Sequence, residues 1–389
     1  MGRHPYFAWA LVAALVSICS SLVSLAFNHH GDMTNAISVG SLFHEREGVA
    51  DLIRGSRPTI HSREGFDGQF FLALGHDPLL LKPATFNALD APHFRARRIF
   101  FPVVARLIEN RRTSVPFGML VTQYMSLLFL ALTGAAYLRQ RKLNPLFIFS
   151  LVISFSLVHT LETFTSEALA SLFVLIALYC YVNERWWIAW LGVALAILTK
   201  EISAIVLIAI VTAEALKGQW KRALLLATAA LPFLLWIFYV SIQFPGSPSL
   251  LNGAQNLKLP FVGLVSTCIA DSARCLSGKD MFINALRVLM RLWLLFASLY
   301  AFYSLHKQRS AAAIFASLAA LLAVTLTSGP KTYAYDVVRN FGRQLYLLPL
   351  GIFWLFAEDN KKQSAYLLVS FLLLSIANHY LIMAGRISF

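Results

Sequence analysis

The chain has 389 residues, of which 58% are hydrophobic and only 13% are charged, and its mean hydropathy is +0.65. A soluble domain carries roughly a quarter of its residues as charged ones, so this composition excludes an ordinary water-soluble protein. The net charge of +14 therefore indicates membrane lipids, phosphorylated lipid carriers or the cytoplasmic leaflet as partners, and no nucleic acid.

Apolar stretches recur along the whole chain at lengths that suit a hydrocarbon core of about 30 Å. Because every backbone polar group must be satisfied inside a bilayer, we expect these stretches to be helices. The predicted fold class is an all-α membrane protein, a polytopic bundle of about eleven transmembrane helices that forms one domain over residues 1–389. The expected spans are 7–27, 115–137, 145–160, 166–182, 186–199, 202–216, 222–241, 282–305, 311–327, 344–357 and 364–384.

The distribution of lysine and arginine over the short connections orients the chain. Placing the N-terminus inside puts Arg139, Arg141 and Lys142 on the cytoplasmic side, whereas the connection 161–165 on the other side has no lysine or arginine. The long connection 28–114 is also rich in cations, but long loops largely escape this rule. We therefore expect a multi-pass protein of the bacterial inner membrane with a cytoplasmic N-terminus.

About 87 residues separate the first two spans, and we expect this segment, 28–114, to be the first extracytoplasmic loop. From Ile37 to Ile53 apolar residues alternate with charged ones, as in an amphipathic helix that lies on the membrane surface. From Pro92 to Ile108 the loop is both basic and apolar. The pattern predicts short interfacial helices whose cations face lipid phosphates.

Two carboxylates in this loop are candidate general bases. Asp32 follows the first span closely, and Asp67 lies in a glycine- and phenylalanine-rich segment. A carboxylate held beside apolar residues at a membrane surface can take a proton from a substrate hydroxyl. The alternative is that both aspartates are helix N-caps, a common role for Asp before an apolar run.

Three motifs in the loop resemble bacterial members of the GT-C superfamily of integral-membrane glycosyltransferases. They are Phe66–Phe71, which reads Phe-Asp-Gly-Gln-Phe-Phe, then His76–Pro78, and Phe94–Pro102, an arginine-rich segment that ends in proline. Thr163–Glu167 is similar to the Ser-Glu opening of a later helix in the related mannosyltransferases of glycolipid-anchor synthesis. The family pattern has tyrosine where this chain has Phe66, and the acidic pair of the protein O-mannosyltransferases is missing, so the choice between Asp32 and Asp67 stays open.

The resemblance implies an inverting glycosyltransferase that moves a sugar from a polyprenyl-phosphate carrier to a glycan, lipid or protein acceptor on the extracytoplasmic face. A loop aspartate is then the base, and cations stabilise the leaving phosphate. The lipid-linked sugar is the donor substrate and no cofactor is required; dependence on a divalent metal is left open. The rival interpretations are a transporter or flippase for a lipid-linked saccharide, an O-antigen-ligase-like enzyme and a non-catalytic subunit of envelope glycopolymer assembly.

Substrate contacts are expected from charged and polar residues near the outer ends of the spans. Lys200 interrupts an apolar run, which is costly in a membrane unless the residue is paired or functional. Its alternative role is an internal ion pair with Glu201 or Glu167. The residues predicted to bind substrate are Gln69, Arg97, Arg98, Glu167, Lys200, Arg339 and Arg343; the last two lie four residues apart, a spacing that suits a phosphate.

The four cysteines give one further prediction. Cys268 and Cys275 lie together in the segment 242–280, the second large extracytoplasmic loop in this topology. In an oxidising compartment they can form a disulfide, although two free thiols remain the alternative. No metal site is assigned, because His29 and His30 beside Asp32 have no recognised metal-binding spacing.

Overall fold

The computed structural model describes residues 4–61, 65–109, 114–154, 157, 160–161, 163–244, 281–327 and 346–383. Over these ranges the chain is almost entirely helical, which confirms the all-α class in its coarse form. The described strands are β1 (Val39–Gly40) and β2 (Ile60–His61), which pair in parallel. Most of the predicted loop 242–280, with Cys268 and Cys275, lies outside the described residues, and so do Arg339 and Arg343.

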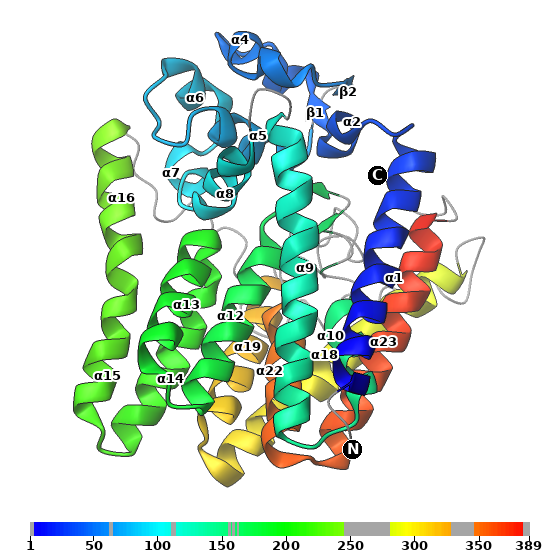
Figure 1. Ribbon diagram of the computed structural model, residues 1–389, viewed down its shortest axis with the longest axis vertical. Helices are drawn as coiled ribbons and strands as arrows, with labels where there is room; N and C mark the ends of the chain where they lie inside the picture. The colour runs from blue at the N-terminus through cyan, green and yellow to red at the C-terminus, as the bar shows by residue number, and fades with distance from the viewer. Residues whose placement is uncertain are drawn as a thin grey trace.

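The long helices pack side by side in one bundle (Figure 1). They are α1 (His4–Asn28), α9 (Val115–Gln140), α12 (Glu167–Val182), α13 (Trp186–Thr199), α14 (Ala204–Leu216), α15 (Trp220–Ala227), α16 (Leu231–Gln243), α18 (Met281–Gln308), α19 (Ala311–Thr327), α22 (Leu347–Asp359) and α23 (Lys362–Met383). Shorter pieces lie between them, namely η2 (Pro145–Phe147), α10 (Ile148–Val152), η3 (Glu201–Ser203) and η4 (Thr228–Ala230).

Four helical stretches among the described residues are long and apolar enough to cross a membrane. They are Pro5–Asn28, Val115–Gln140, Trp220–Gln243 and Ala285–Gln308. Length and composition thus support a membrane protein. Helices α12, α13 and α19 are apolar but shorter, and the number of eleven crossings stays a prediction.

The expected span 145–160 is not one continuous helix. A 3₁₀ turn begins at Pro145, and α10 then ends at Val152. Farther along, the backbone carbonyls of Thr160 and Thr165 both accept hydrogen bonds from the side-chain amide of Gln123 on α9. The side chain of Gln123, which is distant in sequence, therefore donates to backbone carbonyls of this turn. The turn lies inside the bundle.

Residues 29–109 form a separate lobe at one end of the bundle, above the ends of the helices in Figure 1. Its helices are α2 (Met33–Ile37), α3 (Ser41–His44), α4 (Val49–Ile53), η1 (Arg54–Ser56), α5 (Gly68–His76), α6 (Pro83–Ala88), α7 (Pro92–Arg95) and α8 (Phe100–Ile108). We call this part the lobe, and the end of the bundle that carries it the lobe side.

The expected amphipathic helix over 37–53 is instead divided into the end of α2, the strand β1 and the short helices α3 and α4. Ser38 adopts a left-handed conformation after α2, and Gly48 does the same before α4. The apolar side chains of Ile37, Phe43 and Ile53 are buried in the core of the lobe. The apolar spacing predicted helices that lie on lipid. In the structure, these three side chains pack against the rest of the lobe instead.

Helix length determines where the lobe meets the bundle. At 1.5 Å per residue, the 14 residues of α13 span about 21 Å, whereas the 26 residues of α9 span about 39 Å. Figure 1 shows that α13 ends well below the lobe-side ends of α9 and α16. The lobe lies over this recess, so the segment between α13 and α14 faces α7 and α8.

Candidate functional site

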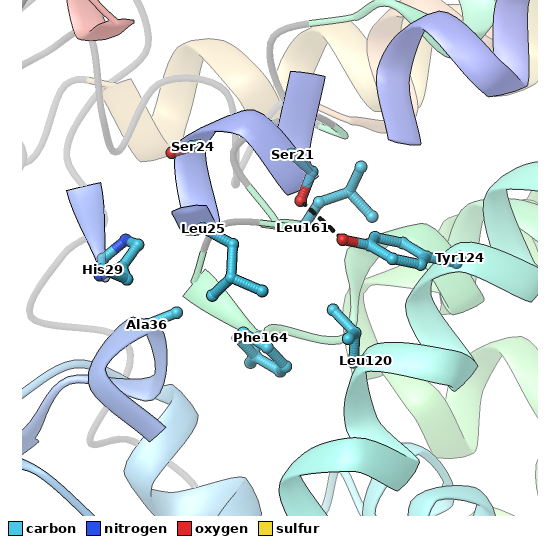
Figure 2. Close-up of a pocket in the computed structure, with 9 residues that line it drawn as sticks. All are labelled: Ser21, Ser24, Leu25, His29, Ala36, Leu120, Tyr124, Leu161 and Phe164. Atoms are coloured by element: carbon cyan, nitrogen blue, oxygen red, sulfur yellow. Dashed lines mark hydrogen bonds between the residues drawn. The ribbon is translucent and has the colours of Figure 1, made fainter. Parts of the chain in front are cut away.

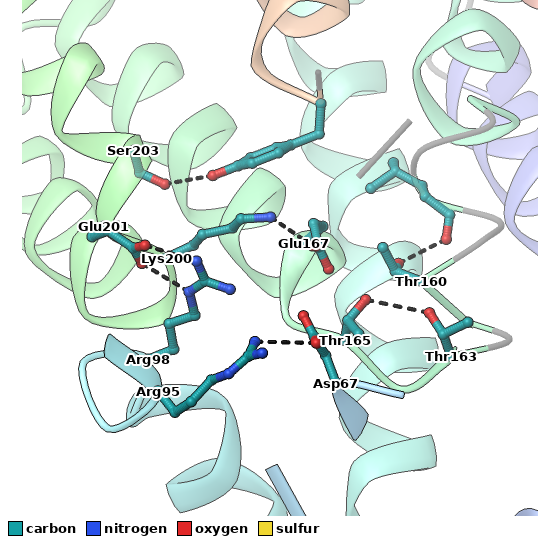
Figure 3. Close-up of polar contacts among 12 residues, drawn as sticks. Asp67, Arg95, Arg98, Thr160, Thr163, Thr165, Glu167, Lys200, Glu201 and Ser203 are labelled. Carbon is teal, nitrogen blue, oxygen red and sulfur yellow. Dashed lines mark hydrogen bonds and ion pairs between the residues drawn. The ribbon is translucent and has the colours of Figure 1, made fainter. Parts of the chain in front are cut away.

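Charged side chains from the lobe and the bundle meet at the recess (Figure 3). The lobe contributes residues from the start of α5 and from the region of α7. The bundle contributes the first residue of α12 and the connection between α13 and α14. We call this group the lobe-side cluster; its members are Asp67, Asp90, Arg95, Arg98, Glu167, Lys200 and Glu201.

Asp67 occupies the N-cap position of α5, but its side chain makes no capping hydrogen bond. It forms an ion pair with Arg95 instead, with 3.1 Å between Oδ1 and Nη1. Arg95 is held in turn by Asp90, at 2.8 and 3.0 Å, and its guanidinium carbon lies 4.2 Å from the Phe70 ring centroid. The carboxylate of Asp67 is thus held in place by Arg95, and it is 24% exposed.

The residue after Asp67 allows the lobe to approach the bundle closely. A Cβ atom on Gly68 would lie 2.8 Å from the carbonyl oxygen of Thr163 and 3.1 Å from that of Ile37. Only glycine fits without a shift of backbone. Figure 3 shows the resulting placement, with the Asp67 side chain pointing toward Thr165 and Glu167.

Arg98 joins the lobe to the bundle through a bidentate pair with Glu201. The Nε and Nη2 atoms of Arg98 donate to the two carboxylate oxygens at 2.9 and 2.7 Å. Burial by itself would raise the pKa of Glu201, but the guanidinium of Arg98 outweighs burial and lowers that pKa to about 2. Both groups are therefore charged at neutral pH.

Lys200 and Glu167 form a second pair that is buried on both sides, with 2.5 Å between Nζ and Oε1. The ammonium also lies 5.1 Å from the centroid of the Tyr346 ring. The Tyr346 hydroxyl is 2.8 Å from that of Ser203, so it stays close to the charged groups. The pair with Glu167, one of the alternatives considered for Lys200, is present in the structure.

The lobe-side cluster is close to neutral before any ligand arrives. Its four carboxylates and three cations leave a formal charge of about −1. An anionic ligand must therefore displace a carboxylate from a cation or bring in further cations. Arg97 is half-buried in the same region, with its guanidinium carbon 6.0 Å from the Phe94 ring centroid.

Asp32 has a different role from Asp67. Its carboxylate caps α2 by accepting from the backbone N–H of Thr34 at 2.8 Å, and it also accepts from the hydroxyls of Thr34 and Thr59. Partial burial would raise its pKa, but these hydrogen bonds outweigh burial and lower it. A carboxylate so satisfied is a weak proton acceptor.

Two other residues of the motifs also serve the architecture of the lobe. The side-chain oxygen of Gln69 accepts from the backbone N–H of Gly40 at 3.0 Å, which fixes β1 beside α5. Asp77 accepts from the backbone of Leu81 and Lys82 and from the hydroxyl of Thr85, so it orders the turn after α5. Gln69, predicted to bind substrate, is buried in this arrangement.

Sequence reasoning missed Gln123, which is fully buried on α9. Its amide nitrogen holds the carbonyls of Thr160 and Thr165 and so fixes the turn that contacts Gly68 and leads into α12. A lone glutamine within an apolar span was the available signal, because polar side chains inside a membrane are costly. Its partners lie about 40 residues away, which sequence spacing does not reveal.

An apolar hollow of about 380 Å³ lies between the lobe and the bundle. It opens between the turn after α5, helix α8, the end of α13 and helix α16. Its lining includes Ile99, next to Arg98, and Leu198, two residues before Lys200. The lining residues are Pro78, Leu79, Ile99, Val103, Leu198, Pro232, Leu235, Trp236 and Tyr239.

A second cavity lies between α1, α9 and α2, on the other side of the 160–165 turn (Figure 2). His29 borders it, and burial is the main reason that the pKa of this histidine is lowered. The Ser21 and Tyr124 hydroxyls face each other across it at 3.3 Å. At about 10 Å³ it holds at most one water molecule, so it is too small for a sugar.

Comparison with known proteins adds no relative: no family model, curated protein or solved structure matches this chain. Within the described ranges, no group of three or more His, Cys, Asp or Glu side chains is arranged to hold a metal ion. The resemblance to the GT-C glycosyltransferases thus depends on the sequence motifs, and the geometry of the cluster has to be interpreted on its own.

Proposed function

We propose that the protein is an inverting glycosyltransferase of GT-C type, which uses a polyprenyl-phosphate sugar as donor and Asp67 as general base. The observation that carries the proposal is the position of Asp67. Its carboxylate stands at a helix start without capping it, is held by Arg95 and remains partly exposed at the junction of lobe and bundle.

The chemistry needs one base and no covalent nucleophile. The Asp67 carboxylate takes the proton of the acceptor hydroxyl as that oxygen forms a bond to the anomeric carbon. The bond from this carbon to the carrier phosphate breaks, and the configuration inverts. Positioned general bases of this kind accelerate reactions by about 10²–10⁴-fold.

The cations of the lobe-side cluster suit the leaving group. Negative charge grows on the carrier phosphate as the bond breaks, and preorganised cations in a water-poor site stabilise it. Lys200 and Arg98 are both buried, and each pairs with a carboxylate of the bundle. We assign them to the phosphate, and Glu167 and Glu201 are their partners in the structure.

The apolar hollow supports a lipid carrier over a water-soluble sugar donor. It is lined by apolar and aromatic side chains and adjoins both Arg98 and Lys200 in sequence. A phosphate at these cations would place the first isoprenoid units of its carrier in this hollow. We therefore assign the hollow to the lipid chain of the donor.

The proposal is tested with purified protein in liposomes that contain radiolabelled polyprenyl-phosphate sugars and an extract of envelope glycans as acceptor. We expect protein-dependent transfer with inverted anomeric configuration. A flippase would instead move a fluorescent lipid-linked saccharide across the bilayer without releasing its sugar. Movement without any transfer from the whole donor panel would overturn the proposal.

A further inference from the structure

A group of large apolar side chains on the lobe faces outward instead of into its core. Leu79, Leu81 and Phe86 are 57%, 68% and 42% exposed, and the exposed Lys82 lies among them. They belong to α6 and to the turn between α5 and α6. We call this group the α5–α6 patch.

The turn is built so that these leucines stay outside. Asp77 accepts from the backbone N–H groups of Leu81 and Lys82 at 3.1 and 2.8 Å and from the Thr85 hydroxyl at 2.6 Å. Leu80 has a φ of 57° and is buried, so its neighbours Leu79 and Leu81 point away from the core. The exposure of the patch is thus a property of an ordered turn.

The contacts of the patch with α16 show at which level along that helix it lies. The Tyr239 hydroxyl donates to the carbonyl of Leu79, and the rings of Phe86 and Phe244 lie 5.0 Å apart. Tyr239 is four residues before Gln243, the last residue of α16, which places it about 6 Å below the end of that helix. The patch therefore lies at the level of a helix end and not above it.

The neighbouring face of α16 is itself apolar and exposed. Leu234, Leu235 and Phe238 lie on the stretch Trp220–Gln243, which is long and apolar enough to cross a membrane. Figure 1 shows the lobe-side end of α16 beside α6 and α7. The patch continues this lipid-facing surface, and tyrosine is typical of the level where acyl chains meet headgroups.

We propose that the α5–α6 patch inserts into the membrane leaflet on the lobe side, with phospholipid as its partner. Leu79, Leu81 and Phe86 lie among the upper acyl chains, and Lys82 extends to the lipid phosphates. The membrane anchor of the lobe is therefore this turn and not the segment 37–53, in which Ile37, Phe43 and Ile53 are buried. The inference does not depend on sugar transfer.

The test uses a chain in which the four native cysteines are replaced by alanine and one new cysteine carries an environment-sensitive fluorophore. Leu81→Cys places the probe on the patch. Leu42→Cys is the matched control, because Leu42 is an exposed leucine on α3, whose contacts are with β1, β2 and α4. In nanodiscs, phospholipids brominated near the headgroup should quench the probe at 81 more than the probe at 42, and aqueous iodide should show the reverse order.

A second comparison leaves the native cysteines in place and measures the thermal transition in nanodiscs of Leu81→Asp and Leu42→Asp. We expect a lower Tm for Leu81→Asp alone, since only there is a charge forced into lipid. Equal lipid quenching at the two positions, or equal Tm values for the two aspartate variants, would overturn the proposal.

Discussion

Charged side chains form ion pairs at both ends of the bundle, but the cations of these pairs are buried at one end and exposed at the other. On the lobe side, Lys200 and Glu167 are both buried, and Arg98 meets Glu201 across the boundary between lobe and bundle. At the opposite end, buried Glu214 on α14 accepts from the Tyr181 hydroxyl and from Lys217, each at 2.8 Å.

The cations account for the difference. At the opposite end, Lys217 is 58% exposed, and Arg222, 4.0 Å from Glu214, is 43% exposed. Such side chains extend to water or headgroups and keep their hydration, as membrane-interface anchors do. On the lobe side the cations have lost most of their water, and that desolvation is seldom recovered by pairing alone. Charges buried at such a cost are by default candidates for function, so we expect function on the lobe side and anchoring at the other end.

The largest expected effect comes from breaking the fully buried pair. Lys200→Met leaves the Glu167 carboxylate buried without its cation and should lower the free energy of unfolding by about 3–5 kcal/mol. Lys217→Met, the matched control at the opposite end, should cost less, because this cation is exposed and the Tyr181 hydroxyl still donates to Glu214. Denaturant unfolding in one detergent measures both, and equal losses would remove the contrast between the two ends.

A double-mutant cycle on Arg98 and Glu201 should show the next largest effect. Arg98→Lys keeps the charge but loses the bidentate geometry, and Glu201→Gln removes the carboxylate charge. We expect a coupling energy of about 1–3 kcal/mol from unfolding measurements on the two single variants and the double variant. The same cycle on Arg222 and Glu214 should give less than about 1 kcal/mol; similar values for the two cycles would contradict the account.

Ligand affinity gives a third test, because a phosphate has to compete with carboxylates already in the cluster. Glu167→Gln should release Lys200 and tighten the binding of a short-chain polyprenyl phosphate by about tenfold, the value of one charge-assisted hydrogen bond. Glu214→Gln should leave this binding unchanged. Titration in detergent micelles checks the prediction, and weaker binding by Glu167→Gln would show that Lys200 is not available to the phosphate.

The smallest effect concerns acid stability and Asp32. Its pKa in the folded protein lies below the ordinary value of 3.8, so its contribution to stability is complete above that value and is lost as the pH falls through the folded pKa. Asp32→Asn should therefore have a lower Tm than the wild type at neutral pH, and the gap should narrow below about pH 4. If the difference in Tm between Asp32→Asn and the wild type does not change with pH, the charge of Asp32 does not contribute to stability.

The helices of the bundle were largely predictable from sequence, because most of the long apolar stretches correspond to helices. The expected span 186–199 coincides with α13, and 115–137 corresponds to α9. The failures have long-range causes. The stretch 145–160 breaks after α10, which ends at Val152, and farther on Gln123 of a different helix holds the carbonyls of Thr160 and Thr165. The segment 37–53 buries Ile37, Phe43 and Ile53 in the core of the lobe, and this packing is not visible in the sequence.

Four of the residues that were predicted to act together lie together in the structure, whereas Asp32 and Gln69 lie elsewhere in the lobe. Asp67, Arg98, Glu167 and Lys200 were all expected to take part, and the Lys200–Glu167 pair was one of the alternatives considered. The contact between Arg98 and Glu201 joins residues 103 positions apart, and no local pattern encodes it. The uncapped geometry of Asp67 likewise depends on Arg95 and on the close approach at Gly68.

The proposed mechanism makes Asp67 the base and Asp32 a structural cap. The direct measurement is the initial rate of sugar transfer from polyprenyl-phosphate donors in liposomes, for Asp67→Asn and Asp32→Asn at equal amounts of folded protein. We predict that Asp67→Asn loses about 10²–10⁴-fold in rate, whereas Asp32→Asn keeps most of its activity. Full activity in Asp67→Asn, or the large loss in Asp32→Asn instead, would contradict the account.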